Sequence, residues 1–168
     1  MTIPKSLTSD ITVRHAKVED RPFVVTTASR LAAFGPPSWR PAQDIVTREV
    51  RTLEEFFDHP QAGTALFIAT SPTEQLLGYV YLESHEDYFS GEQHGHVSII
   101  AVREFGEGKG VGSALMRAAE RWAGSNGFRF LTLNVFEGNG RARAVYEHLG
   151  YHVETLRYIK LLDVGGAA

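Results

Sequence analysis

The chain has 168 residues, a length that predicts one domain spanning 1–168. Hydrophobic residues make up 43% and charged residues 22%, as in soluble globular proteins, and the formal net charge of −3 supplies no basic field for a nucleic acid. The absence of cysteine excludes disulfides, a cysteine nucleophile and thiolate metal sites.

At the start of the chain, residues 1–10 (MTIPKSLTSD) lack the apolar core of a signal peptide. We expect this segment and residues 164–168 to be flexible ends of the domain. The apolar run from Val97 to Val102 is far too short to cross a bilayer. The sequence therefore predicts a cytoplasmic protein with no membrane partner.

Apolar periodicity and turn residues predict a mixture of strands and helices. Because both kinds of element are present, we expect an α/β (α+β) domain around one central sheet. In chain order the expected elements are a strand at 11–16, a helix at 19–34, a proline loop at 35–41, a helix at 46–57, strands at 65–69 and 76–82, a polar loop at 84–95, a strand at 96–102, a helix at 111–123, a strand at 128–136, a helix at 141–149 and a last strand at 153–162.

Residues 106–113 read GEGKGVGS, with glycine at every second position between an expected strand and an expected helix. Bare amides at a helix N-terminus bind anions, most often phosphate. A tight turn alone would need only one or two glycines. The P-loop pattern fails because Lys109 is followed by Gly110 instead of Ser or Thr. The dinucleotide pattern also fails, because no start in this segment gives glycines at n, n+2 and n+5.

Two segments, in this order, resemble motifs of the GNAT superfamily of N-acetyltransferases. Residues 102–115, VREFGEGKGVGSAL, resemble its acetyl-CoA loop, Arg/Gln-x-x-Gly-x-Gly/Ala, with Glu107 in place of the first Arg or Gln. Residues 139–151, NGRARAVYEHLGY, resemble its Asn-x-x-Ala-x-x-x-Tyr-x-x-x-Gly-Phe/Tyr motif. The resemblance covers roughly residues 76–162, and the pair of motifs is far more specific than either one alone.

The resemblance implies a single GNAT-like domain whose central mixed, mostly antiparallel sheet is flanked by helices. Its fourth and fifth strands, at about 96–102 and 131–136, would splay apart to admit the pantetheine arm of acetyl-CoA. No metal is expected, and Glu107 should point outward, away from the pyrophosphate. The implied cofactor-binding residues are Ile100, Ala101, Val102, Glu107, Gly108, Lys109, Gly110, Val111, Gly112, Ser113, Asn139, Arg141 and Tyr146.

The resemblance also implies a proton donor. Tyr146 occupies the position of the family's usual general acid, and a phenol with a pKa of about 10 is protonated at neutral pH. The alternative is a helix tyrosine that packs against the sheet and whose hydroxyl only hydrogen-bonds the cofactor sulfur. Asn139 would bind the pantetheine arm, cap the helix that follows it, or do both.

The general base is expected on the strand at 96–102. Several superfamily members carry it six residues before the apolar residue that ends the strand, and counting back from Val102 gives His96. An imidazole with a pKa of about 6.5 suits this work, with Ser98 holding a relay water. The alternatives are a strand-edge histidine without a role and Glu83 as the base. Strict alternation would place His94, His96, Ser98 and Ile100 on one face of the strand and Gly95, Val97, Ile99 and Ala101 on the other.

These features together imply transfer of an acetyl group from acetyl-CoA to a primary amine. Without cysteine, the amine would attack directly in a ternary complex. The acceptor is open between a small-molecule amine and a protein or peptide amine, and a homodimer is open as well. The other readings are a non-catalytic acyl-CoA-binding or regulatory module on the same fold, and transfer of a longer acyl group.

Overall fold

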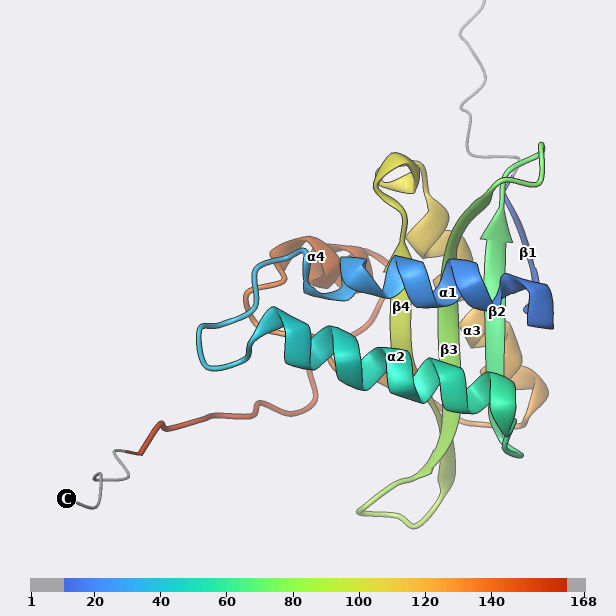
Figure 1. Ribbon diagram of the computed structural model, residues 1–168. Coiled ribbons are helices and arrows are strands. Elements are labelled where there is room, and N and C mark those ends of the chain that lie inside the picture. Colours follow the sequence, from blue (N-terminus) through green and yellow to red (C-terminus); the bar gives the residue numbers. More distant parts are fainter. Residues whose placement is uncertain (1–10, 163–168) are drawn as a thin grey trace, which may run out of the picture.

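A sheet of five strands, ordered β1-β2-β3-β4-β5, forms the centre of the computed structural model, which describes residues 11–162 (Figure 1). The flexible ends expected at 1–10 and 164–168 lie outside the described residues. Neighbouring strands are antiparallel except β4 and β5, which are parallel. The strands are β1 (Thr12–His15), β2 (Thr64–Thr70), β3 (Leu76–Glu86), β4 (Gln93–Val102) and β5 (Leu131–Leu133).

Helices cover both faces of this sheet. Figure 1 shows α1 and α2 crossing the front of the sheet and α3 behind it. No helix within residues 11–162 is long and apolar enough to cross a membrane. The helices are α1 (Arg21–Thr27), α2 (Ala42–Asp58), α3 (Val111–Ser125) and α4 (Gly140–His148), with short 3-10 turns at Val18–Asp20, Ala28–Ala32 and Glu104–Gly106.

The core is divided by the sheet into two apolar layers. On the side of α1 and α2, Leu53 and Ile68 pack around Tyr79, and all three side chains are fully buried. On the side of α3, Leu82 packs with Leu115, both also fully buried. Burial of one such side chain contributes about 1.5–3 kcal/mol, so the two layers hold the sheet as a rigid base for the site.

The polar segment at 84–95 was expected to be a loop, and this prediction is wrong. β3 runs on to Glu86 and β4 begins at Gln93, so only residues 87–92 form the turn. His85 pairs with His94 in the register of the two strands. Backbone hydrogen bonds build this ribbon without an apolar side chain at each position, and apolar periodicity therefore misses it.

The strand expected at 153–162 is absent from the structure. This segment has no regular secondary structure, and its large apolar side chains are exposed. A strand needs a neighbouring edge for its backbone hydrogen bonds, and no strand of residues 11–162 lies alongside it. The other differences are smaller. The helix at 19–34 is divided into 3-10 turns around α1, α2 begins at Ala42, and β5 keeps three residues of 128–136.

A β-bulge at Ser98 divides β4 in two. Tyr81 pairs with Ile99 and Leu82 pairs with Val97, so β4 carries one extra residue between these pairs. The bulge reverses which face of the sheet the alternate side chains of β4 lie on. Val97 packs in the layer of α3, whereas Ile99 packs in the layer of α1 and α2. The strict alternation expected along β4 is therefore wrong beyond Ser98.

The splay of β4 and β5 is confirmed by their pairing. The two strands pair at only three positions, from Gly95 with Leu131 to Val97 with Leu133. Beyond Val97, β4 bulges and continues to Val102 without β5 beside it. The second half of β4 thus has one free edge.

Candidate active site

A cavity of about 960 Å³ lies where β4 and β5 separate. Its walls come from the second half of β4, from the start of α3 with the loop before it, and from residues between β5 and α4. Of the predicted cofactor residues it brings together Ile100, Ala101, Val102, Glu107, Gly108, Gly110, Val111, Gly112, Ser113, Asn139, Arg141 and Tyr146. Lys109 is exposed and does not line it.

The glycine loop forms an anion cradle at the N-terminus of α3. Gly110 is the N-cap residue and adopts φ +82°, a left-handed conformation that favours glycine. The amides of the first helical residues have no acceptor within the helix, so they are free to bind a ligand. A Cβ added at Gly112 would meet no atom within 4 Å. The open space and the positive end of the 15-residue helix α3 fit a phosphate group.

Glu107 stands beside this cradle and lines the cavity, so the expectation that it points outward is wrong. Its carboxylate accepts a hydrogen bond of 2.7 Å from the Arg30 guanidinium and a second from Arg141. Arg141, and then Arg30, lower the pKa of the Glu107 carboxyl. The two guanidiniums therefore offset the negative charge that would otherwise oppose a phosphate.

Tyr146 lies on the wall of the cavity, on α4. Burial raises the pKa of its phenol, which keeps the hydroxyl protonated at neutral pH. Its ring also packs edge-on against Tyr151, with 6.1 Å between the ring centroids. Asn139 caps α4, because its side chain accepts a 3.2 Å hydrogen bond from the Ala142 amide, and it lines the cavity as well.

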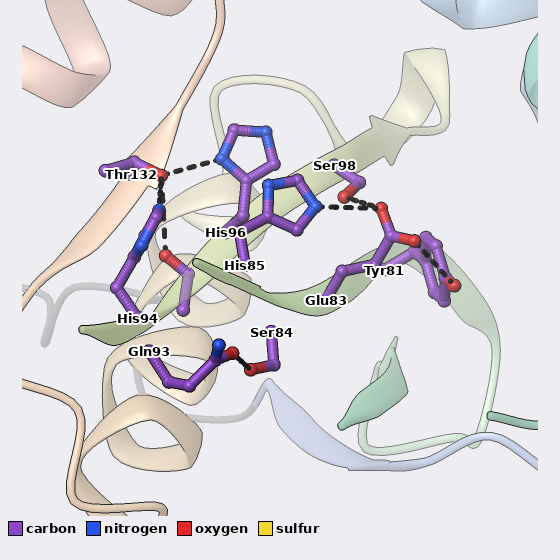
Figure 2. Close-up of polar contacts among 10 residues, drawn as sticks. Tyr81, Glu83, Ser84, His85, Gln93, His94, His96, Ser98 and Thr132 are labelled. Carbon is purple, nitrogen blue, oxygen red and sulfur yellow. Dashed lines mark hydrogen bonds and ion pairs between the residues drawn. The ribbon is translucent and has the colours of Figure 1, made fainter. Parts of the chain in front are cut away.

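The three candidates for the base lie together on the β3–β4 ribbon (Figure 2). His96 and Ser98 line the cavity, whereas Glu83 lies behind Ser98 and accepts a hydrogen bond from its hydroxyl. His96 bonds Thr132 through Nδ1, 2.7 Å from the threonine oxygen. Burial, and then the neighbouring His85, lower the pKa of His96 to about 4. This value is far below the 6.5 on which the sequence-based expectation depends.

Glu49 lines the cavity from α2 and is not among the site residues predicted from the sequence. Burial raises the pKa of this carboxyl; the charge of Arg48 lowers it, and that of Glu83 raises it. Its side chain has no hydrogen bond or ion pair with any residue of 11–162. A signal was present in the sequence: Glu49 is spaced three residues after Val46 and four before Leu53, on the apolar stripe of its helix.

Comparison with known proteins agrees with this geometry. Residues 32–151 match the model of the Acetyltransferase (GNAT) family. A mycothiol acetyltransferase from Amycolatopsis mediterranei (strain U-32) is 34% identical over 117 residues, which cover 67% of this chain and 38% of that protein. The chain therefore spans less than half the length of this relative.

Solved structures share the fold at low sequence identity. A ribosomal-protein-alanine N-acetyltransferase from Brucella melitensis biovar Abortus 2308 superposes with a TM-score of 0.65 at 20% identity, over 90% of this chain and 99% of that one. An aminoglycoside N-acetyltransferase in complex with CoA superposes with a TM-score of 0.67 at 20% identity, over 98% of this chain and 100% of that one.

Proposed function

The chain belongs to the GNAT family of acetyltransferases, and we propose that it transfers the acetyl group of acetyl-CoA to a primary amine by direct attack in a ternary complex. One observation carries this proposal. A free strand edge, an anion cradle at a helix N-terminus and the hydroxyl-bearing Tyr146 line a single cavity. These are the groups that a pantetheine arm, a pyrophosphate and a leaving thiolate require.

In this proposal the cofactor is bound mainly by backbone. Main-chain groups at Ile100 and Val102, on the free half of β4, bond the pantetheine arm as an added strand would. Amides at Val111 to Ser113 bind the pyrophosphate. Arg141 lines the cavity beside them and adds a positive charge.

The acceptor end of the cavity is acidic, which favours a cationic amine. Glu49 faces the cavity without a partner of its own among residues 11–162. The carboxylate of Glu83 lies near enough to Glu49 to raise its pKa. An ammonium group bound there would relieve the repulsion of the two carboxylates. Because relatives carry the name mycothiol acetyltransferase, a mycothiol-related amine is one acceptor to test.

For the proton of the amine we propose the Ser98–Glu83 pair as acceptor. The Ser98 hydroxyl faces the cavity and already donates to the Glu83 carboxylate, so it can take a proton from the amine as it passes its own to Glu83. His96, with a pKa near 4, is a weaker base than an ordinary imidazole. Tyr146 then donates its proton to the thiolate that leaves.

The test is a turnover screen with acetyl-CoA, in which released CoA is measured over a panel of polyamines, amino acids, aminoglycosides, peptide N-termini and a mycothiol-related amine. We expect CoA release that depends on one class of amine and exceeds hydrolysis without amine. Cofactor binding without turnover over the whole panel would instead favour a non-catalytic acyl-CoA-binding module. Faster turnover with a longer acyl-CoA would reassign the donor.

The same assay tests the acidic end. Glu49→Gln keeps the size of the side chain and removes its charge. We expect the KM for the amine to rise by about tenfold while the KM for acetyl-CoA stays near the wild-type value. Glu55→Gln, which changes an exposed glutamate on the same helix, is the matched control. Equal amine KM in Glu49→Gln and wild type would remove Glu49 from the acceptor site.

A further inference from the structure

We propose that His85, His94 and His96 form a binding site for a divalent transition-metal ion of the zinc class. The three side chains project from the β3–β4 ribbon (Figure 2). Of the three, His96 lines the cavity. The sequence-based expectation of no metal considered thiolate sites, and this site uses imidazole nitrogens alone. The site requires neither acetyl-CoA nor an amine.

The geometry of the three rings fits a common ligand. One ring nitrogen of each histidine lies within 4.8 Å of the corresponding nitrogens of the other two. Nitrogen ligands at about 2.0–2.1 Å from a tetrahedral zinc ion are about 3.4 Å apart, so side-chain rotations that close the rings by on the order of 1 Å are sufficient. His85 and His94 are direct cross-strand partners, and His96 follows His94 on the same face.

His94 supplies a second, independent observation. This residue is only 7% exposed, and its Nδ1 atom is buried without a hydrogen-bond partner within residues 11–162. Its other nitrogen, Nε2, lies 3.1 Å from the Thr132 hydroxyl. A buried ring nitrogen without a partner is costly, and a metal ion is a ligand that would satisfy it.

The surroundings of the rings resemble the outer shell of a metal site. The Thr132 hydroxyl bonds one nitrogen of His94 and one of His96, which fixes the orientation of both rings. The ring of Phe130 stacks on His94 at 4.8 Å between centroids. The carboxylate of Glu83 lies 3.8 Å from Nε2 of His85 and adds a negative charge near the cation. Three imidazoles leave a fourth tetrahedral position open, and His96 borders the cavity.

The test measures zinc binding to tag-free protein stripped with EDTA, by competition with a chromophoric chelator. We expect one equivalent of Zn²⁺ per chain, with affinity more than about 100-fold weaker in His85→Gln and in His96→Gln. Thr132→Val removes only the outer-shell hydroxyl and should cost about 10- to 100-fold. Co²⁺ in place of Zn²⁺ should give the visible absorption of a tetrahedral site in the wild type and not in His85→Gln.

Two controls make the result decisive. His59→Gln removes an exposed histidine at the end of α2 and should leave the affinity unchanged. Zinc should raise the melting temperature of the wild type and of His59→Gln, and should fail to raise that of His85→Gln, which changes an exposed side chain. No competition with the chelator at equimolar zinc, or equal loss of affinity in His59→Gln and His85→Gln, would overturn the proposal.

Discussion

The two halves of β4 use the same strand in opposite ways. Before the bulge at Ser98, residues 93–97 pair with β3, residues 95–97 pair with β5 as well, and this half presents histidine side chains. After it, residues 99–102 pair with β3 alone and leave a backbone edge free toward the cavity. In the first half, the contacts depend on which face of the sheet each side chain lies on. In the second half, they depend on backbone groups along the free edge of the strand. One extra residue in the strand separates the two kinds of site.

The largest effect is expected where recognition depends on backbone. Gly112→Asp places a carboxylate in the anion cradle, at a position where a Cβ meets nothing within 4 Å and the fold is not strained. Loss of charge-assisted hydrogen bonds to the pyrophosphate costs about 2–3 kcal/mol, so acetyl-CoA affinity should fall by on the order of 100-fold. Calorimetry measures this affinity.

Gly112→Asn is the matched control, because it has nearly the same shape without the charge. We expect it to bind acetyl-CoA more tightly than Gly112→Asp. An acidic residue in the first turn of a helix also stabilises the helix, so the melting temperature of Gly112→Asp should not fall. Undiminished affinity in the Asp variant would remove the pyrophosphate from this cradle.

The next prediction concerns Tyr146, which lies in the site whether it donates a proton or only packs there. Tyr146→Phe should lower kcat by roughly 10- to 10³-fold with little change in the KM for acetyl-CoA, because the hydroxyl acts in the transition state. Tyr151→Phe is the control, since its ring packs against Tyr146 while its hydroxyl bonds Glu120. Wild-type kcat in folded Tyr146→Phe would assign Tyr146 to packing alone.

Features of the site that lie in one contiguous segment could be predicted from the sequence, and features that depend on strand geometry or on distant residues could not. The glycine loop and the Asn139-to-Tyr151 segment are contiguous, so local spacing was sufficient to identify the family, and the family and fold are confirmed. The faces of β4 were predicted wrongly past Ser98, because a bulge leaves no mark in apolar alternation. The pairing of Glu107 with Arg30 joins residues 77 positions apart, which no local pattern records.

A different cause explains the failed strand at 153–162. Its composition favours a strand, but a strand forms only against a partner edge. Leu156 and Tyr158 are 71% and 88% exposed, which shows that composition alone did not place this segment in the sheet. The zinc-class site was missed for a related reason, because His85 was assigned to a loop and its neighbours His94 and His96 were read along one strand only.

The next prediction compares two candidates for the general base, Glu83 on β3 and His96 on the first half of β4. With EDTA-treated protein, Glu83→Gln should lower kcat/KM for the amine by roughly 10²-fold, because Ser98 loses its proton acceptor. His96→Gln should lower it by less than about tenfold, since burial already holds the pKa of this ring near 4. The reverse order would make His96 the base. Little change in either variant would mean that the amine reaches the site already deprotonated.

The smallest effect is expected beside the anion cradle, where charged side chains and backbone amides would bind the same cofactor phosphates. Glu107 takes the place of the family's Arg or Gln and pairs with Arg30 and Arg141 beside the cradle. Glu107→Gln removes this charge and releases both guanidiniums for the cofactor phosphates. Such partly exposed pairs are worth about 0.2–1 kcal/mol, so acetyl-CoA affinity should tighten by about two- to fivefold and become more sensitive to salt.

Glu104→Gln is the control for that change, because it removes the same charge from an exposed site three residues earlier in the chain, without a guanidinium pair among residues 11–162. A fivefold gain in Glu107→Gln against none in Glu104→Gln would show that the paired carboxylate competes with phosphate for the two arginines. Weaker binding in Glu107→Gln would show the opposite, that Glu107 orients Arg30 and Arg141 toward the cofactor. In that case the anion site would depend on a side-chain network as well as on its backbone. The contrast between a side-chain site at the first half of β4 and a backbone site at the second half would then be smaller than proposed.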